Sequence, residues 1–352
     1  MQLDDSSFVL KNDPKGMMDL NLGFPEQCQE ALSLASKTIL PNVLSGKKQI
    51  VVAGIGGSAA GGDFLKALIE SEGSVPCFVA RDYRMPTFVG ADTLVFACSY
   101  SGNTEETLSS VRDALSRGAS VVAITSGGEL ADICKTQNLP VIAIPGGQPP
   151  RTALGYLLMP MIVACVQLGY LPEQRFDAAI EELKKCRADW RIEANSERNQ
   201  PKALSNMLFG RVPIIYGLGA WQGIVASRWK SQINENAKVM CFANTFPELN
   251  HNEIVGWTLA DHQNVKHWAT VILENGLESL KMKTRAQVTG ELIRGKSELF
   301  HVTARGDCLL SQLLSLTYFG DFVSLYLAAH YGVDPFEIEN INILKKRLSD
   351  VH

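Results

Sequence analysis

The sequence lacks the features that mark several large protein classes. Its eight cysteines include no CxxC pair, and several lie in apolar strand-like runs, so we expect buried thiols rather than disulfides or metal ligands. It has no HxxxH pair and no His/Cys/Asp cluster, so we expect no metal site. No apolar run approaches the roughly 20 residues that span a bilayer. The segment after Met1 has neither a basic nor an apolar region of a signal peptide. We therefore expect a cytoplasmic protein that does not use a membrane.

An excess of charge of one sign is also missing. The chain has 33 Lys and Arg against 37 Asp and Glu, a net charge of -4. This balance gives no support for nucleic acid or an anionic membrane as the main partner. The 352 residues are 46% hydrophobic, which is ordinary globular composition. At this length we expect two domains of roughly 150 residues each.

Short apolar segments alternate with helix-length segments in the first half of the chain. The predicted strands are 49–53, 76–80, 93–98, 120–125 and 140–144, and the predicted helices between them are 58–70, 104–117 and 128–136. Strands of this kind with helical crossovers are typical of a doubly wound α/β fold, in which helices cover both faces of a parallel sheet.

The same pattern restarts in the second half. A strand at Val212–Tyr216 is followed by the turn Gly217-Leu-Gly219 and a helix from Trp221 to Asn236, which echoes Gln49–Ala53 and the glycine turn after it. Two such units indicate an internal duplication of one α/β domain. We expect a helical segment at 1–40 that packs on the core, a first domain at 41–195, and a second domain with C-terminal helices at 196–352.

A glycine-rich loop follows the first strand. In Gly54-Ile-Gly-Gly-Ser-Ala-Ala-Gly-Gly62, the residues Gly56, Gly57 and Ser58 open the next helix. Glycines let the backbone approach a ligand, and a helix N-terminus offers free N–H groups to an anion. Two other interpretations stay open. The loop could be a dinucleotide fingerprint with Asp82 as the ribose partner, or a turn needed only for packing.

A second loop places three hydroxyl groups at the start of another helix. Ser99, Ser101 and Thr104 lie within six residues, directly after the strand that ends at Cys98. Hydroxyls together with helix-terminal N–H groups make a socket for a phosphate dianion. A helix cap is the alternative, but a cap needs only one hydroxyl. We therefore predict a phosphate site at this loop.

The two loops together resemble the sugar isomerase (SIS) domain family, whose members bind phosphosugars. Further segments resemble the bifunctional phosphoglucose/phosphomannose isomerases of bacteria and archaea, and the similarity runs over nearly the whole chain. These segments are Asp13–Met17, Pro150–Tyr156, Asn234–Lys238 (NENAK), Pro247–Glu253 (PELNHNE) and Gly256-Trp257. The resemblance implies two SIS domains and a homodimer. It also implies interconversion of a hexose 6-phosphate between aldose and ketose forms through a cis-enediol, without metal or redox cofactor.

The resemblance also implies roles for individual residues. The glutamate that matches Glu235 is the base that moves the proton between carbons 1 and 2, although a glutamate between two asparagines is ordinarily a solvated surface residue. His251 matches the ring-opening histidine, contributed by the neighbouring subunit of the dimer. Arg151 matches the arginine that stabilises the enediolate. Either Lys345 or Lys346 matches a lysine near the ring oxygen.

One position departs from the family pattern. In the isomerases that the chain resembles, acceptance of mannose 6-phosphate goes with a small hydroxyl residue, threonine rather than glutamine, near the C-terminus. No threonine lies between Val333 and His352, and Phe336 follows Asp334-Pro335. Glucose 6-phosphate is therefore the expected aldose, with mannose 6-phosphate left open. Two rival functions remain: a non-catalytic SIS protein that senses phosphosugars, which would not need Glu235 and His251, and a nicotinamide-dependent oxidoreductase, which would leave the second loop unexplained.

Overall fold

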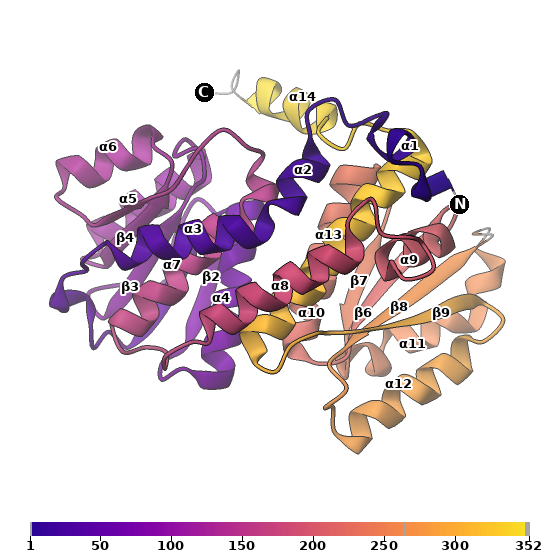
Figure 1. Cartoon of the computed structure of the whole chain (residues 1–352). Helices are drawn as coiled ribbons and strands as arrows, with labels where there is room; N and C mark the ends of the chain where they lie inside the picture. Colours follow the sequence, from indigo (N-terminus) through magenta and orange to yellow (C-terminus); the bar gives the residue numbers. More distant parts are fainter. Residues whose placement is uncertain (1, 264, 266, 349–352) are drawn as a thin grey trace. The chain divides into compact units, whose positions relative to one another are not determined.

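The computed structural model describes residues 2–263, 265 and 267–348 (Figure 1). The chain forms two compact units, and we name each after its sheet. The five-stranded unit comprises Gly23–Lys184 and Gly306–Leu314, and the four-stranded unit comprises Met1–Leu22, Lys185–Arg305 and Ser315–His352. These units differ from the ranges expected from the sequence, because residues 1–22 and 185–195 group with the second half of the chain and 306–314 with the first.

The sheet of the five-stranded unit is parallel throughout, in the order β2-β1-β3-β4-β5. Its strands are β1 (Gln49–Ala53), β2 (Cys77–Ala80), β3 (Thr93–Cys98), β4 (Ser120–Thr125) and β5 (Val141–Ala143). Every residue of β3 is buried, as expected for a central strand with helices on both faces. Each of these strands overlaps the predicted one, and the predicted α/β fold class is confirmed.

Helices cover both faces of this sheet (Figure 1). They are α3 (Phe24–Ser36), α4 (Gly57–Glu72), α5 (Glu105–Ser116), α6 (Gly128–Thr136) and α7 (Leu154–Gln167). Two glycines of the first loop motif serve packing in α4. A Cβ on Gly62 would lie 2.8 Å from Val52 Cγ1, and one on Gly61 would lie 3.1 Å from Met161 Cε. These glycines let α4 pack closely between β1 and α7.

The four-stranded unit repeats the arrangement. Its parallel sheet has the order β7-β6-β8-β9, which matches β2-β1-β3-β4 and confirms the duplicated topology. Its strands are β6 (Val212–Gly217), β7 (Phe242–Thr245), β8 (Trp268–Glu274) and β9 (Ser297–Thr303). The sequence predicted only β6 among them. β7 and β9 have no fully apolar run because they are edge strands, and most of their residues are only partly buried or exposed.

Two long helices pack together in the four-stranded unit. α10 (Ala220–Gln232) packs against α13 (Leu309–Tyr331), where the rings of Trp229 and Phe319 stack with centroids 5.5 Å apart. A Cβ on Gly320 would lie 2.2 Å from Trp229 Nε1, so only glycine allows this approach. Arg228 on α10 also donates a 3.0 Å hydrogen bond to the buried carboxylate of Asp321 on α13. Packing and a buried ion pair thus fix α10 on α13.

Seven further helices complete the described part of the chain. They are α1 (Ser6–Leu10), α2 (Met17–Leu22), α8 (Phe176–Trp190), α9 (Gln200–Leu208), α11 (Glu253–Gly256), α12 (Leu280–Ile293) and α14 (Glu339–Leu348), with short 3-10 segments between them. The long helical region predicted at 152–200 is therefore three helices, α7, α8 and the start of α9.

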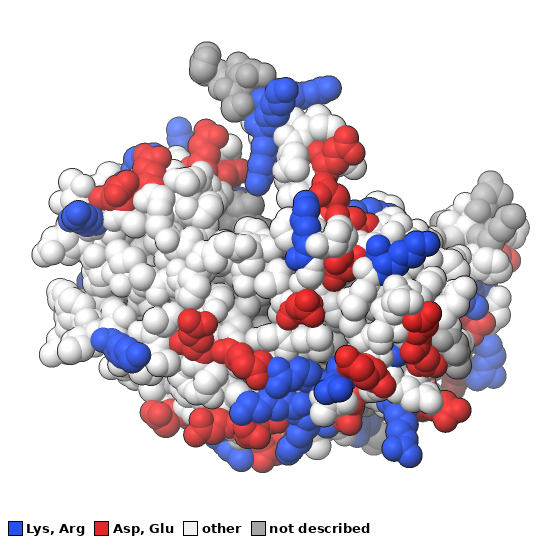
Figure 2. Space-filling view, turned by 45° about the horizontal axis from the view of Figure 1, so that its top comes forward, with Lys and Arg blue, Asp and Glu red and all other residues white. Residues whose placement is uncertain are grey.

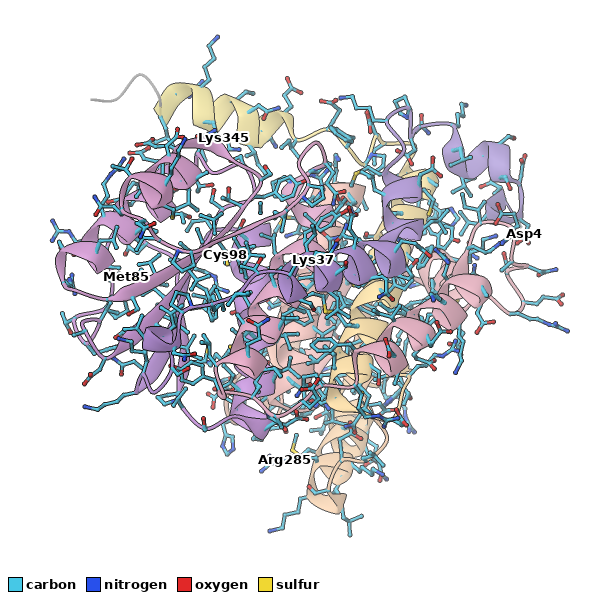
Figure 3. The ribbon with its side chains drawn as sticks, turned by 60° about the vertical axis from the view of Figure 1, so that its left-hand side comes forward. Asp4, Lys37, Met85, Cys98, Arg285 and Lys345 are labelled. Carbon is cyan, nitrogen blue, oxygen red and sulfur yellow. The ribbon has the colours of Figure 1, made fainter. Side chains whose placement is uncertain are left out.

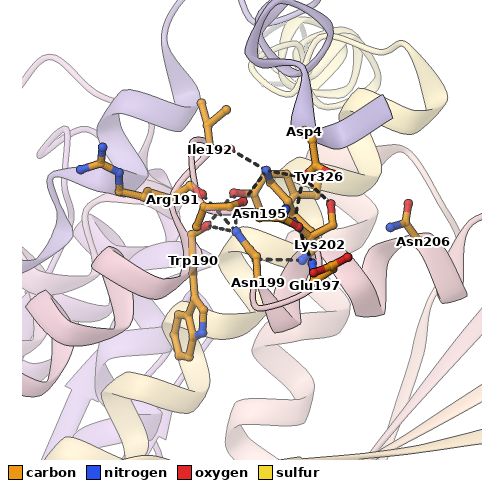
Figure 4. Close-up of polar contacts among 12 residues, drawn as sticks. Asp4, Trp190, Arg191, Ile192, Asn195, Glu197, Asn199, Lys202, Asn206 and Tyr326 are labelled. Carbon is orange, nitrogen blue, oxygen red and sulfur yellow. Dashed lines mark hydrogen bonds and ion pairs between the residues drawn. The ribbon is translucent and has the colours of Figure 1, made fainter. Parts of the chain in front are cut away.

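A fully buried lysine holds the segment between α8 and α9 (Figure 4). Lys202 Nζ donates to the carbonyl oxygens of Ile192 at 2.5 Å and Ala194 at 2.8 Å, and lies 3.4 Å from Asp4 Oδ1. Asn199 caps α9 by accepting from Lys202 N at 3.0 Å. Three backbone and side-chain acceptors thus compensate a charge that burial would otherwise make costly. The N-terminal segment is joined to the four-stranded unit here.

The surface and the thiols match the sequence expectations. Figure 2 shows acidic and basic side chains intermixed on the visible face, without a broad area of one sign. All eight cysteines are free, and all except Cys308 are buried. Burial raises the pKa of the Cys77 thiol to about 12. Among the described residues, no helix is both long enough and apolar enough to cross a membrane.

Candidate active site

The two predicted loops lie next to one another in the five-stranded unit. The chain runs from β1 to β2 on one side and then returns to β3 on the other side of β1. The strand order therefore reverses between β1 and β3. In open α/β sheets, ligands bind outside the carboxyl ends of the strands at such a switch point. The first loop follows β1 and the second follows β3, so both border this position.

The first loop has the geometry of a backbone that approaches a ligand. Gly56 is exposed and has a φ of 57°, a conformation that favours glycine. Gly57 begins α4, and a Cβ on it would lie 2.7 Å from the carbonyl oxygen of Pro150. Ser58 is 5% exposed and accepts a 3.3 Å hydrogen bond from the backbone N–H of Tyr100. Ser58 thereby joins the first loop to the second.

The second loop is organised by Ser99, which is fully buried. Its hydroxyl donates to Thr104 Oγ1 at 3.0 Å and accepts from Thr104 N at 3.4 Å. Because the Thr104 oxygen accepts this bond, its own hydrogen keeps the capacity to donate to another acceptor. Ser101 is exposed, and its Oγ accepts from the backbone N–H of Asn103 at 3.3 Å. Ser99 thus orders the loop, while Ser101 and Thr104 present hydroxyls at its surface.

The helix-cap alternative does not describe this loop. Thr104 occupies the N-cap position of α5, but its side chain makes no capping hydrogen bond. The first N–H groups of α5 therefore keep their capacity for another acceptor. Gly102 has a φ of 73°, and a Cβ there would lie 1.7 Å from the carbonyl oxygen of Gly127. The loop is held tightly against the start of α6, with its hydroxyls and N–H groups available to an anion.

Arg151 lies beside the first loop. It belongs to the short 3-10 segment η3 (Pro150–Thr152), just before α7, and is 5% exposed. A Cβ on Gly57 would lie 3.1 Å from Arg151 N, so the two backbones are in close contact. An arginine whose backbone lies beside a glycine loop is a candidate to bind an anion or a developing negative charge. The structure therefore brings Gly57, Ser58, the second loop and Arg151 together within one unit.

Glu235 lies on an irregular turn rather than on a regular helix. α10 ends at Gln232 and continues as η4, a π-helical turn over Ile233–Ala237. Such turns occur frequently at functional sites. Asn234 Oδ1 accepts from Cys241 N at 2.9 Å, and Asn236 Nδ2 donates to Ser324 Oγ at 2.9 Å. Lys238 has a φ of 58° and donates to the carbonyl oxygen of Glu235 at 2.7 Å. The residues around Glu235 thus hold its turn.

His251 ends the 3-10 segment η5 (Glu248–His251), and its side chain is exposed. The turn around it is fixed on both sides. Leu249 is fully buried, and Asn250 Nδ2 donates to Thr289 Oγ1 on α12 at 3.0 Å. On the other side, Glu253 accepts hydrogen bonds from Tyr216 and Asn244. The imidazole of His251 is therefore exposed on a turn that is fixed on both sides.

Glu235 and His251 lie at opposite ends of the four-stranded sheet. β6 leads from its carboxyl end into α10, so η4 lies at the amino end of the strands, just before β7. His251 follows the carboxyl end of β7. The 13 residues of α10 measure about 20 Å at 1.5 Å per residue. Glu235 and His251 of one chain therefore do not face each other across the sheet.

Lys345 and Lys346 lie on α14, a helix with no buried residue (Figure 3). The sequence did not indicate which of these two lysines matches the lysine near the ring oxygen, and both side chains are exposed in the structure. Phe336, at the position that departs from the family pattern, lies below Lys15 Nζ, which is 4.6 Å from the ring centroid.

Asp82, considered as a ribose partner, accepts from the N–H of Tyr83 at 2.6 Å.

Sequence reasoning missed several residues that support the candidate site. Tyr216, Asn244 and Glu253 hold the turn of His251, and Ser324 holds the turn of Glu235. Glu253 belongs to the quoted PELNHNE segment, but its partners lie up to 37 residues away, and only the tertiary structure pairs them. Among the described residues, no group of three or more His, Cys, Asp or Glu is arranged to hold a metal ion.

Two family models match the chain. Residues 43–146 match the SIS domain, and residues 197–348 match the bacterial phospho-glucose isomerase C-terminal SIS domain. A bifunctional phosphoglucose/phosphomannose isomerase of Caldicellulosiruptor bescii is 38% identical over 339 residues, which cover 95% of this chain and 99% of the relative. A protein of the same name from Thermoplasma acidophilum is 38% identical over 300 residues, 85% of this chain and 89% of the relative.

Solved structures show the same fold. A hypothetical protein from Thermus thermophilus superposes with a TM-score of 0.75 over 97% of this chain and 92% of its own, at 17% identity. At that identity the likeness concerns the fold alone. The family models and the relatives at 38% identity show the family as well as the fold. The chain belongs to the bifunctional phosphoglucose/phosphomannose isomerase family, and both of its halves contain SIS domains.

Proposed function

We propose that this chain interconverts glucose 6-phosphate and fructose 6-phosphate, and that mannose 6-phosphate is a second aldose substrate. The observation that carries this proposal is the pair of loops at the β1/β3 switch point. Their glycines, hydroxyls and helix N-termini, beside the buried Arg151, form a socket for a sugar phosphate. The same socket would serve a non-catalytic phosphosugar sensor. Glu235 on its supported turn favours catalysis, because a sensor needs no such base.

Each residue has a chemical task in this reaction. The phosphate binds at Gly56, Gly57, Ser58, Ser101 and Thr104, with Ser99 ordering the second loop. His251 moves the proton that opens the sugar ring. Glu235 then removes the proton from carbon 2 of the aldose, the electron pair forms the C1–C2 double bond, and oxygen 1 takes up a proton. Oxygen 2 then loses its proton and forms the carbonyl bond to carbon 2. The C1–C2 double bond opens, and its electron pair takes up the returned proton at carbon 1 to complete the ketose.

Arg151 stabilises the negative charge that develops on the enediolate oxygens. Lys345 or Lys346 is assigned to the ring oxygen, where a cation would favour the opening step. No step in this scheme changes the oxidation state of the molecule as a whole, since carbon 1 is reduced while carbon 2 is oxidised. The scheme therefore needs no nicotinamide, and since Arg151 supplies the positive charge for the enediolate, it needs no metal either. We propose a cytoplasmic enzyme that works without cofactor.

We also propose a homodimer in which His251 serves the active site of the partner subunit. The separation of Glu235 and His251 along one sheet supports this arrangement. Large apolar side chains around the His251 turn are exposed, including Val255 at 67% and Leu259 at 57%. The edge strand β7 and the residues before it add Phe242 at 47% and Met240 at 65%. An exposed apolar patch of this kind suits a subunit interface.

Glu235→Gln tests the proposed function. The variant keeps the shape of the side chain and removes its basicity, so turnover should fall by about 100- to 10,000-fold while sugar-phosphate binding persists. Turnover is measured with glucose 6-phosphate, mannose 6-phosphate and fructose 6-phosphate, and binding by calorimetry. Glu298→Gln, an exposed glutamate on β9, is the matched control. A loss below about fivefold would place the base elsewhere, and absence of turnover by the unmodified chain would favour the sensor.

A further inference from the structure

The carboxylate of Glu253 is held by two side chains from neighbouring strands. Tyr216 on β6 donates its hydroxyl hydrogen to Glu253 Oε1 at 2.5 Å, and Asn244 on β7 donates to Oε2 at 2.5 Å. Both donors are the second-to-last residues of their strands. The two bonds occupy both oxygens of the carboxylate, and hydrogen bonds to an ionised acceptor are about twice as strong as neutral ones.

The direction of the Tyr216 bond is fixed by a third residue. Trp257 Nε1 donates to the Tyr216 hydroxyl oxygen at 2.9 Å. An indole N–H can only donate, so the hydroxyl accepts from Trp257 and its own hydrogen points to Glu253. Tyr216 and Trp257 are both buried, and a chain of hydrogen bonds in such an environment is strengthened along its length. Glu253 is thus the acceptor at the end of a buried chain.

Glu253 begins α11 directly after a kink in the backbone. The preceding residue, Asn252, has a φ of -146° and a ψ of -71°, and His251 precedes it. Moving the Glu253 carboxylate therefore moves the start of α11 and the turn that ends at His251. On the other side, Asn250 is held by Thr289 at 3.0 Å, and its amide oxygen lies 3.3 Å from Arg285 Nη1. His251 and Asn252 are the exposed residues between these two anchors.

We propose, on the basis of the proposed function, that Glu253 is a positioning residue for the ring-opening step. It holds the turn of His251 against β6 and β7, so that the exposed imidazole has one orientation toward the sugar. Glu253 does not touch the substrate and takes no part in proton transfer between carbons 1 and 2. Its loss should therefore impair the reaction of ring-closed sugars and spare the reaction of a sugar that is already open.

A substrate that cannot close its ring separates these steps. In 5-deoxyfructose 6-phosphate, the hydroxyl that closes the furanose ring is absent, so the ketone stays open. Proton transfer is measured for it and for fructose 6-phosphate by deuterium incorporation at carbon 1 in D₂O, followed by NMR. For Glu253→Gln we expect kcat/KM to fall at least about tenfold with fructose 6-phosphate and to change less than about twofold with the deoxy sugar. Glu298→Gln should leave both rates unchanged.

A second variant separates positioning from general damage to the fold. In Glu253→Gln, the new amide nitrogen faces the amide nitrogen of Asn244, and neither can accept a hydrogen bond. Adding Asn244→Asp restores the pair with its direction reversed, because the Gln nitrogen can donate to the new carboxylate, while Tyr216 still donates to the Gln oxygen. The double variant should recover most of the fructose 6-phosphate rate.

Two results would overturn this role for Glu253. An equal loss with both sugars would show that Glu253 supports the whole protein rather than the ring-opening step, and an unchanged rate with fructose 6-phosphate would show that the contact has no effect. Glu235→Gln provides the separate check on the proposed function, since it should lose the reaction of both sugars. Retention of both reactions by Glu235→Gln would place the proton-transfer base elsewhere, and absence of turnover by the unmodified chain would refute the proposed function. Neither result resembles the selective loss with fructose 6-phosphate that is expected of Glu253→Gln.

Discussion

The side-chain amide nitrogen of Asn236 lies 2.9 Å from the hydroxyl oxygen of Ser324, and this hydrogen bond joins the turn of Glu235 to α13. Ser324 in turn donates to the carbonyl oxygen of Asp321 at 2.7 Å. The carboxylate of Asp321 accepts from Gln232 at 2.9 Å, one residue before the π-helical turn. The turn that carries the proposed base is therefore fastened to a buried helix at both ends.

Asn236→Ala should lower turnover more than it lowers binding. Removing the amide frees one end of the turn, and a displacement of about 1 Å in a catalytic group can cost about 100-fold in rate. We expect kcat to fall by about 10- to 100-fold with KM nearly unchanged, as measured with fructose 6-phosphate. Ser231→Ala, which removes a partly exposed hydroxyl from α10, is the control. Unchanged kcat for Asn236→Ala would show that the turn holds its shape without Ser324.

The phosphate loop is tested by Ser101→Ala and Thr104→Val. Each hydrogen bond to a charged group contributes roughly 1.5–3 kcal/mol, so each change should weaken sugar-phosphate binding by about ten- to a hundredfold. Inorganic phosphate should compete with the sugar phosphate in the unmodified chain. Ser116→Ala, at the other end of α5, should bind normally. Normal binding by both loop variants would move the phosphate site away from the second loop.

The buried lysine of the four-stranded unit gives a prediction about stability. Lys202→Met fills a similar volume but leaves the carbonyl oxygens of Ile192 and Ala194 without their shared donor. An unsatisfied buried polar group costs roughly 1–3 kcal/mol, so we expect the free energy of unfolding to fall by about that amount or more. Urea unfolding measures the change. Lys184→Met removes an exposed pair with Glu181 and should cost at most about 1 kcal/mol. If the two variants lowered the free energy of unfolding equally, the buried contacts of Lys202 would contribute no more than the exposed pair of Lys184 and Glu181.

His330 predicts a dependence of stability on pH. Its ring is half-buried, stacks on Phe209 with centroids 5.0 Å apart, and lies 2.8 Å from Asn206 Oδ1. Burial lowers the pKa of His330 below its ordinary value of 6.5. The unfolded chain then binds a proton more readily, so this contribution to stability is present above about pH 6.5 and is lost as the pH falls toward the lowered value. His330→Gln should reduce the slope of the free energy of unfolding against pH, measured by urea unfolding at pH 5 to 8. A slope unchanged by the substitution would contradict this assignment.

Sequence reasoning succeeded where periodicity and local chemistry act within a short segment. The strand–loop–helix pattern located β1 and β3 with their loops, because apolar runs and glycines are local signals. It did not predict β7, β8 and β9. It extended the helix of Glu235 to Asn236 as regular, whereas the structure has a π-helical turn there. That turn is held by the hydrogen bond from Asn236 to Ser324, which lies 88 residues away in the sequence. No local sequence pattern predicts a contact between residues so far apart.

The final prediction concerns the shared active site. Glu235→Gln chains and His251→Ala chains should each be inactive alone. If His251 acts on the partner's sugar, a heterodimer of the two variants contains one site with both residues intact and one site with neither. Equal amounts of the two chains place half of all dimers in the mixed state, so about one site in four should be functional, as two-fold symmetric pairing requires. Fructose 6-phosphate formation is assayed after the chains are co-expressed or are unfolded and refolded together.

The control for this experiment uses two changes that must fail to complement. Glu235→Gln and Asn236→Ala lie on the same turn, η4, so every site in their heterodimer carries one of the two changes and activity should stay near that of the separate variants. Mass measurement establishes that heterodimers have formed in both mixtures. Rescue in the Glu235/His251 mixture alone places the two residues of one site on different chains, in agreement with their positions at opposite ends of one sheet. If heterodimers form and their activity does not exceed the sum of the two variants, both residues act within a single chain. In that case the chain would have to rearrange to bring Glu235 and His251 together, because α10 separates them in this structure.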